Sequence, residues 1–109
     1  MNKIKIDESW NLNEAIQNSM QEPILLFKHS TSCGISHMAL KNFESDLEGI
    51  DSTYKYYFLD LITYRSISNE IADTLDVRHE SPQLIVIKDG KVTHHASHHS
   101  ISIKEVELT

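Results

Sequence analysis

The sequence contains a single cysteine, three glycines and two prolines among its 109 residues. One cysteine cannot close an internal disulfide, so any disulfide chemistry must use a sulfur atom from another molecule. Such sparse use of cysteine fits a reducing cytoplasm. No apolar run approaches the roughly 20 residues of a membrane-spanning helix, and residues 1–7 lack the apolar segment of a signal peptide. We therefore expect a cytoplasmic protein that does not act at a membrane.

Basic residues are also scarce. Ten lysines and arginines stand against sixteen aspartates and glutamates, which gives a formal net charge of -6 at pH 7. This balance argues against nonspecific nucleic-acid binding, because such binding requires a basic surface to neutralise phosphates. The chain length and the 39% share of hydrophobic residues are those of an ordinary globular protein. We expect residues 1–109 to form one domain with its own hydrophobic core.

Apolar or aromatic runs alternate with amphipathic segments along the chain. Such runs are typical of buried strands, and they predict strands over residues 24–27, 56–59 and 84–87. The dipeptide Asp89-Gly90 predicts a tight hairpin that leads to a fourth strand over residues 91–96. Capping patterns and helical hydrophobic spacing predict helices, which we expect at residues 11–20, after Gly34 to about Gly49, from Ser66 or Ser68 to Leu75, and from Ser102 onward.

The predicted order is helix, strand, helix, strand, helix, strand, strand, helix. Strands that alternate with helices indicate parallel pairing through crossover helices, and the closing hairpin adds an antiparallel edge. This is the order of elements in the thioredoxin-like fold. We therefore expect an α/β domain in which a central four-stranded mixed sheet is flanked by helices.

Cys33 lies between the first predicted buried strand and the longest predicted helix. The thiolate is the nucleophilic form of cysteine, and unpaired amides at a helix N-terminus stabilise its negative charge. Thr31 and Ser32 can add hydroxyl donors. The alternative is a structural cysteine that packs as a small hydrophobe, but the polar segment around Cys33 is a poor place for core packing. The sequence therefore predicts a redox-active thiol.

Two further positions bear on this thiol. Ser36 follows Cys33 by three residues, where a dithiol oxidoreductase carries its resolving cysteine. Because serine cannot close a disulfide, a second thiol molecule would have to release whatever Cys33 accepts. Ser81-Pro82 precedes the third predicted strand, and in thioredoxin-like proteins this loop faces the active cysteine. The simpler alternatives are an ordinary first-turn serine and an ordinary turn proline, and the sequence does not settle whether the proline bond is cis.

Three segments of the chain form a recognisable set: Phe27-Lys28-His29-Ser30-Thr31-Ser32-Cys33-Gly34-Ile35-Ser36, then Ser81-Pro82-Gln83, then the Asp89-Gly90 hairpin. Together they resemble the YtxJ-like monothiol bacilliredoxins, over nearly the whole chain. The resemblance implies that Cys33 attacks a mixed disulfide between bacillithiol and a client protein, accepts the bacillithiol and frees the client thiol. A second bacillithiol would regenerate Cys33.

The same resemblance implies the participants in the reaction. Bacillithiol would be a thiol co-substrate, with no bound cofactor and no metal, and the partners would be bacillithiolated client proteins. Bacillithiol disulfide reductase would take part indirectly, by recycling the product. Cys33 would be the catalytic residue. The residues expected to bind substrate or support the thiol are Thr31, Ser32, Gly34, Ile35, Ser36, Ser81 and Pro82.

Gly34 departs from the family pattern, which usually has proline after the cysteine. Proline suits the first helical position, whereas glycine gives a looser turn with one more N–H. Cys33-Gly34-Ile35-Ser36 is also one residue from the Cys-Gly-Phe-Ser centre of monothiol glutaredoxins, which share a [2Fe–2S] cluster between two subunits. Those proteins have a longer loop before the cysteine and a Gly-Gly site, and this chain has neither. A third alternative is a non-catalytic redox sensor or adaptor.

Seven histidines are many for this length, and four of them form the adjacent pairs His94-His95 and His98-His99. Imidazole binds zinc, copper and nickel. However, neighbouring side chains on a strand point to opposite faces, so the two members of a pair cannot easily share one metal. We therefore expect exposed polar residues, with His98 and His99 in a loop that borders the active site in this fold.

Overall fold

The computed structural model describes residues 2–31, 34–50 and 55–105, so Ser32 and Cys33 lie outside the described part of the chain. The elements follow the predicted order after one additional strand at the start. They are β1 (Asn2–Lys5), α1 (Leu12–Asn18), β2 (Ile24–His29), α2 (Gly34–Ile50), β3 (Lys55–Asp60), α3 (Arg65–Leu75), β4 (Gln83–Lys88), β5 (Lys91–Ser97) and the 3₁₀-helices η1 (His98–Ser100) and η2 (Ile103–Glu105).

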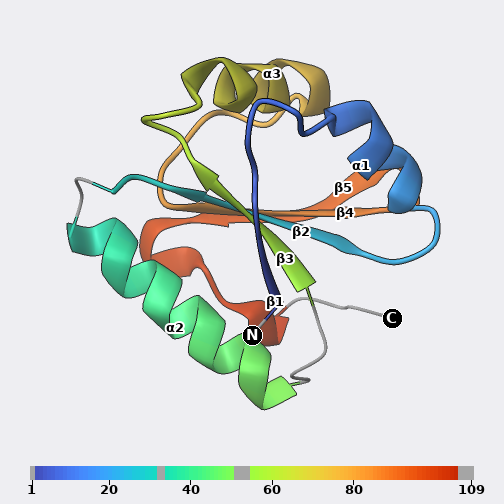
Figure 1. Ribbon diagram of the computed structural model, residues 1–109. Coiled ribbons are helices and arrows are strands. Elements are labelled where there is room, and N and C mark those ends of the chain that lie inside the picture. The colour runs from blue at the N-terminus through green and yellow to red at the C-terminus, as the bar shows by residue number, and fades with distance from the viewer. Residues whose placement is uncertain (1, 32–33, 51–54, 106–109) are drawn as a thin grey trace.

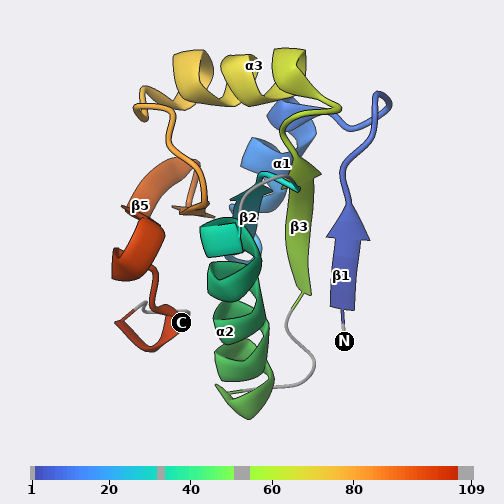
Figure 2. The same ribbon diagram turned by 90° about the vertical axis from the view of Figure 1, so that its left-hand side faces the viewer.

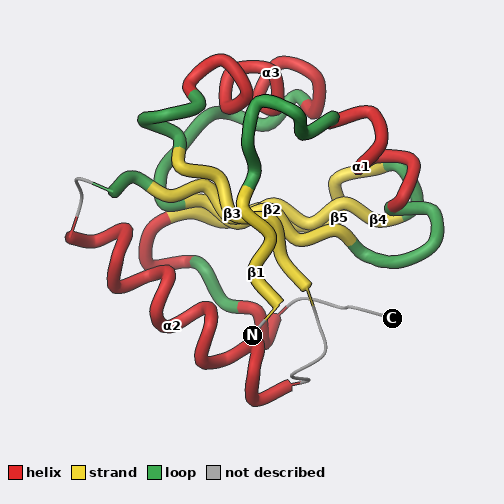
Figure 3. The backbone as a smooth tube through the Cα atoms, viewed as in Figure 1, coloured by secondary structure: helices red, strands yellow, loops and turns green. Residues whose placement is uncertain are grey.

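A mixed sheet with strand order β1-β3-β2-β4-β5 forms the centre of the structure. β1, β3 and β2 are parallel, whereas β4 runs antiparallel to both β2 and β5. α1 and α3 cover one face of the sheet, and α2 with the 3₁₀-helices covers the other (Figure 1 and Figure 3). The predicted α/β architecture with flanking helices is therefore confirmed.

The prediction of four strands was wrong by one, because β1 adds a fifth strand at the edge of the sheet. β1 pairs with β3, and Ile4 lies opposite Tyr57. An outer strand has a neighbour on one side only, and charged residues are common there. The alternation Lys3-Ile4-Lys5 suits this position, but it lacks the continuous apolar run that identified the central strands.

The start of α1 agrees with the capping pattern. Asn11 is the N-cap, and its side-chain Oδ1 accepts a hydrogen bond of 3.1 Å from the amide of Glu14. This bond satisfies one of the amides that a helix start leaves without a partner. The helix ends at Asn18, two residues before the predicted end.

The predicted start of the third helix was wrong. α3 begins at Arg65 after the N-cap Tyr64, which makes no side-chain capping bond, so neither Ser66 nor Ser68 is the cap. Ile67, Ile71 and Leu75 of this helix pack in the core, and Ser68 is buried within it. The last predicted helix is a 3₁₀-turn over Ile103–Glu105 in the described part, and residues 106–109 lie outside it.

The predicted hairpin joins β4 to β5. Asp89 and Gly90 have φ angles of 53° and 79°, and two positive φ values are the requirement of a type I′ turn. The amides of both residues donate to Ser19, one to its carbonyl and one to its Oγ, each at 2.9 Å. The tip of the hairpin is therefore attached to the end of α1.

The core has two parts, one on each side of the sheet. Leu12, Ala15 and Ile71 from α1 and α3 contribute to the first part. Phe43 and Leu47 from α2 contribute to the second. β2 is buried along its whole length and supplies side chains to both parts. This double burial explains why its sequence is a continuous apolar run rather than an alternating one.

The register of the central strands brings the predicted site segments to one end of the sheet. Lys28, near the end of β2, lies opposite Gln83, the first residue of β4. The loop that contains Pro82 therefore lies at the sheet end where the chain leaves β2 and α2 begins (Figure 2).

No helix in the described ranges is both long and apolar enough to cross a bilayer.

Gly90 in the hairpin turn and Gly49 in α2 allow a first test of the backbone conformation. Gly90→Ala should lower the free energy of unfolding by about 1 kcal/mol, because alanine disfavours positive φ. The added Cβ would lie 3.5 Å from the sulfur of Met20, an ordinary contact, so the cost is one of backbone conformation. Gly49→Ala, within α2 and with nothing near the new Cβ, should instead raise the unfolding free energy by up to about 1 kcal/mol. Urea unfolding of both variants checks the contrast, and equal effects would contradict it.

Candidate functional site

Cys33 and Ser32 lie outside the described residues, whereas the residues on either side of them are described. Thr31 follows the end of β2 and is exposed, and Gly34 is the first residue of α2. The predicted placement of this segment between a buried strand and a long helix therefore matches the elements that flank it. Amides at the start of a helix attract negative charge, as a thiolate requires.

Ser36 is fully buried in the first turn of α2. Its Oγ accepts a hydrogen bond of 3.0 Å from the amide of Ser30 and lies 2.7 Å from Nδ1 of His29. Because Oγ already accepts from the amide, its own hydrogen can be donated to His29, whose Nδ1 is then unprotonated. The hydroxyl therefore joins the first turn of α2 to the end of β2.

His29 is buried at the end of β2, and its surroundings favour the neutral ring. Burial lowers the pKa of His29, the nearby His37 and Lys3 lower it further, and Asp60 acts in the opposite direction. The rings of His29 and His37 make an edge-to-face contact with 4.6 Å between centroids. A neutral His29 is the form that can accept the hydroxyl hydrogen of Ser36.

His37 links the chain before Cys33 to the helix after it. Its Nε2 lies 2.9 Å from the carbonyl oxygen of Thr31. Since a carbonyl can only accept, Nε2 carries the hydrogen and donates it. This bond and the bonds of Ser36 join residues 29–31 to the first turn of α2.

The bond between Ser81 and Pro82 is cis, and Pro82 is buried. The carbonyl oxygen of Pro82 accepts a hydrogen bond of 3.0 Å from the amide of His98. Oγ of Ser81 is buried and has no hydrogen-bond partner among the described residues. The loop before β4 is thus attached to η1, at the same sheet end as the start of α2.

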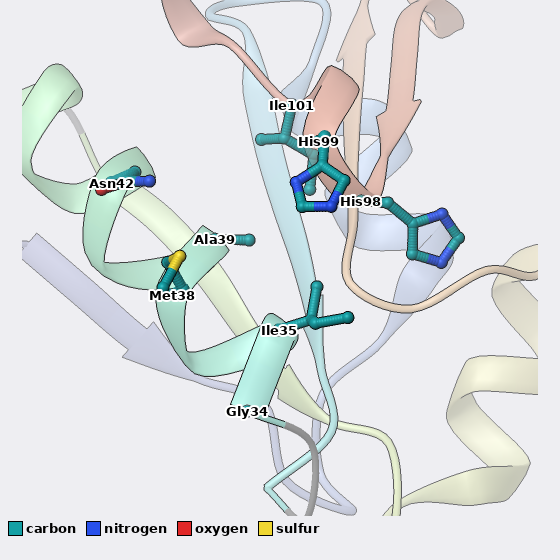
Figure 4. A pocket seen from close by; sticks show the side chains of 8 residues that line it. All are labelled: Gly34, Ile35, Met38, Ala39, Asn42, His98, His99 and Ile101. Atoms are coloured by element: carbon teal, nitrogen blue, oxygen red, sulfur yellow. The ribbon is translucent and has the colours of Figure 1, made fainter.

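A groove runs along the first turns of α2, between that helix and the segment after β5 (Figure 4). Its volume is about 390 Å³. Ile35 and Met38 are more than half exposed there, at 52% and 65%. His98 and His99 line the groove together with Gly34, so both histidines border the start of the helix as expected.

A second groove of about 700 Å³ lies against β1, the end of β3 and the first turn of α2. Figure 2 shows β1 on one side of α2 and the 3₁₀-helices on the other, so the two grooves flank the helix. Charged and polar side chains line the second groove, unlike the first. They include Lys3, Lys5, Asp7, His29, Thr31, His37, Asp60 and Tyr64.

The sequence analysis assigned no role to Lys28, although the structure makes it one of the largest fully buried side chains. Its Nζ lies 3.1 Å from Nδ1 of His79, which also lies 3.3 Å from Oγ of Ser68. Burial lowers the pKa of Lys28 from 10.5 to about 8. The sequence did contain a signal of this burial, namely a lysine at the end of an apolar run.

The histidine pairs do not gather into a metal centre in the structure. On β5, His94 is partly buried and His95 is exposed, as alternation along a strand requires. In the ranges that the structure describes, no three histidine, cysteine, aspartate or glutamate side chains are placed to hold a metal ion.

A family model described as monothiol bacilliredoxin BrxC matches residues 4–106. The chain belongs to the monothiol bacilliredoxin family. The match includes every residue that the sequence analysis proposed for the site. Members of this bacilliredoxin family are distinguished by a single active thiol, and the one cysteine of this chain is consistent with membership.

Solved structures show that this bacilliredoxin has the thioredoxin fold. A proposed oxidoreductase with a thioredoxin fold is 27% identical, with a TM-score of 0.78 over 94% of this chain and 88% of that chain. Thioredoxin O2 from Arabidopsis thaliana, in its oxidised state, is 16% identical with a TM-score of 0.68, over 94% and 86%. Thioredoxin from Schistosoma mansoni is 16% identical with a TM-score of 0.64, over 91% and 85%. The two thioredoxins support the fold alone.

The buried hydroxyl of Ser36 should contribute measurably to stability. Ser36→Ala removes the acceptor of the Ser30 amide and the partner of His29, so we expect the free energy of unfolding to fall by about 2 kcal/mol. Ser45→Ala, at an exposed position of the same helix, is the matched control and should change it by less than about 0.5 kcal/mol. Urea unfolding measures both, and equal stability of the two variants would overturn the assignment.

The buried cation of Lys28 predicts a pH-dependent effect. Because the pKa of Lys28 is lower in the folded chain than in the unfolded chain, burial costs stability below pH 8, and the cost disappears as the pH rises to 10.5. Lys28→Met should therefore be more stable than the wild type at pH 7, by roughly 2 kcal/mol. This advantage should shrink between pH 8 and pH 10.5.

Urea unfolding at a series of pH values measures this difference. Lys91→Met, at an exposed position of β5, is the control and should differ from the wild type by the same amount at every pH. A pH-independent difference for Lys28→Met would show that the buried amine is not responsible.

Proposed function

We propose that this protein is a monothiol thiol–disulfide oxidoreductase that removes bacillithiol from protein mixed disulfides. The observation that carries the proposal is the bacilliredoxin family match over residues 4–106, in a chain with one cysteine and with serine at the resolving position. The resemblance of residues 27–36 and 81–83 to bacilliredoxins suggests which small thiol takes part, because bacillithiol is the small thiol with which that family acts.

The first half of the reaction is a thiol–disulfide exchange at Cys33. Its thiolate attacks the bacillithiol sulfur of the client's mixed disulfide, and a new disulfide forms between Cys33 and bacillithiol. The bond between bacillithiol and the client breaks, and the client sulfur leaves as a thiolate that takes a proton from water. The first-turn amides of α2 support the proposal, because they favour the attacking thiolate over the thiol.

The second half regenerates Cys33. The thiolate of a second bacillithiol attacks the bacillithiol sulfur bonded to Cys33, so bacillithiol disulfide forms and the Cys33 thiolate is released. Bacillithiol disulfide reductase would then reduce this product elsewhere. Ser36 cannot take the place of the second bacillithiol, because its hydroxyl forms no disulfide and is already bonded to Ser30 and His29.

The cis Ser81–Pro82 loop supports a binding role beside this chemistry. It lies at the sheet end where α2 begins, and its carbonyl bond to His98 fixes it against η1. In the proposal this loop and the first turn of α2, with Gly34 and Ile35, form the surface that meets the mixed disulfide. Thr31 and Ser32 supply hydroxyl groups next to the thiol.

The [2Fe–2S] carrier remains a second candidate because of one observation, the glycine that follows Cys33. In this alternative Cys33 would be a cluster ligand and the cluster would be cargo. Anaerobic reconstitution with iron, sulfide and glutathione tests it directly. A brown product with absorbance near the visible range would favour cluster transfer over exchange.

Turnover tests the proposed exchange. Wild type should reduce a bacillithiolated protein catalytically in the presence of bacillithiol, bacillithiol disulfide reductase and NADPH, and Cys33→Ser should reduce the rate to that without protein. Ser45→Ala, an exposed serine of α2, should keep the wild-type rate. If Cys33→Ser performs as well as wild type, exchange is excluded. If the wild type accepts bacillithiol by intact mass but does not turn over, the protein is a sensor or adaptor.

A further inference from the structure

The loop over residues 76–82, which we call the Pro82 loop, joins α3 to β4 (Figure 2). Near its start, the carbonyl oxygen of Arg78 accepts a hydrogen bond of 3.0 Å from Nε2 of Gln83. At its end, the carbonyl oxygen of Pro82 accepts one of 3.0 Å from the amide of His98. Amides and carbonyls do not titrate near neutral pH, so both attachments are independent of pH there.

His79, in the middle of the Pro82 loop, makes a third attachment. Its Nδ1 lies 3.1 Å from Nζ of Lys28 on β2 and 3.3 Å from Oγ of Ser68 on α3. Lys28 and Ser68 are fully buried, whereas His79 is exposed. The imidazole therefore connects the loop to two other elements while the residue remains accessible to solvent.

The contact with Lys28 sets the protonation state of the ring. A lysine ammonium has only hydrogens to donate, so Nδ1 of His79 must accept, and the ring hydrogen is on Nε2. A protonated ring would turn an N–H toward a second donor of the same charge, and the bond would be lost. The hydroxyl of Ser68 can donate or accept, so it imposes no such condition. The attachment to β2 therefore requires a neutral His79.

The surroundings of His79 favour the same neutral form. Burial lowers the pKa of His79, and the cations Lys28 of β2 and Arg65 of α3 lower it further. Glu80, the next residue of the loop, raises this pKa, although its carboxylate also accepts a hydrogen bond from the hydroxyl of Ser97 on β5. The ring is therefore neutral near neutral pH and gains its proton only in acid.

We propose that His79 is a positioning residue that fastens the Pro82 loop to β2 while its ring is neutral, and that protonation of the ring releases this attachment. The bonds of Arg78 and Pro82 remain, so acid loosens the middle of the loop rather than unfolding it. This inference rests on the proposed function only for its effect on exchange, in which the loop meets the mixed disulfide. Mild acid should then slow exchange by loosening the loop as well as by protonating the thiolate.

The direction of the pH effect follows from the lowered pKa of His79. The ring titrates at its ordinary pKa of 6.5 when the loop is open, and at a lower pKa when the loop is closed. Closure is therefore strongest above pH 6.5, weakens as the pH falls below 6.5, and changes no further below the pKa of the closed loop. Between these limits the ratio of closed to open loop falls by at most about tenfold per pH unit. Alkali should not release the loop, because a neutral Lys28 amine still has hydrogens to donate.

Hydrogen exchange measured by NMR tests the release. The reporter is the protection factor of the His98 amide, which is bonded to Pro82, corrected for the intrinsic exchange rate at each pH. Between about pH 7.5 and about pH 5.5, the wild-type value should fall several-fold. His79→Asn should stay nearly constant, because Oδ1 of asparagine takes the place of Nδ1 as an acceptor and does not titrate. His95→Asn, at an exposed position of β5, is the matched control and should fall as the wild type does.

Two results would overturn the inference. One is a wild-type protection factor that stays constant over this range, and the other is a His79→Asn variant that loses as much protection as the wild type. Lys28→Met is a second check, since it keeps the titrating ring and removes the like charge. Its loss of protection in acid should be smaller than that of the wild type, and an undiminished loss would show that Lys28 does not oppose protonation of the ring.

Exchange kinetics separate this inference from the proposed function. The measurement is the ratio of the rate constants of His79→Asn and wild type with bacillithiol disulfide, in which the titration of the shared thiol cancels. The ratio should be close to one near about pH 7.5 and rise several-fold by about pH 5.5. A constant ratio would exclude the effect on exchange. If the wild type does not exchange at all, the proposed function fails, and hydrogen exchange at His98 still decides whether His79 holds the loop.

Discussion

The hydroxyl of Ser36 makes the contact on which the geometry of this site depends. It accepts the amide of Ser30 and lies against Nδ1 of His29, so it fastens the first turn of α2 to the end of β2. The bond from His37 to the carbonyl oxygen of Thr31 is a second link between the chain after β2 and the first turns of α2. The serine at the resolving position therefore also joins the two elements that flank Cys33 in the sequence.

Two buried ionisable side chains lie at the end of β2, next to the contacts of Ser36. Lys28 and His29 are both buried, and each has a partner elsewhere in the chain, His79 between α3 and β4 for the lysine and Ser36 of α2 for the histidine. Buried polar groups of this kind persist where partners satisfy them. Burial lowers the pKa of both groups and so favours their neutral forms.

The sequence predicted the elements whose signals are local and failed where the cause lies elsewhere in the chain. The buried run at the start of β2, the Asn11 cap and the Asp89-Gly90 turn were recognisable because neighbouring residues alone determine them. β1 was missed because an outer strand needs no apolar run. The second groove, against β1 and the end of β3, could not be foreseen either, since it depends on the pairing of β1 with β3 rather than on any motif.

β1 has a second consequence, which follows from its place at the outer edge of the sheet. An outer strand offers unpaired backbone groups to the strands of other molecules, and lysine side chains there discourage such pairing. Lys3 and Lys5 thus protect the protein against self-association through this edge. A variant that neutralises both lysines removes part of that protection. Resistance to aggregation at this edge therefore depends on these two charges.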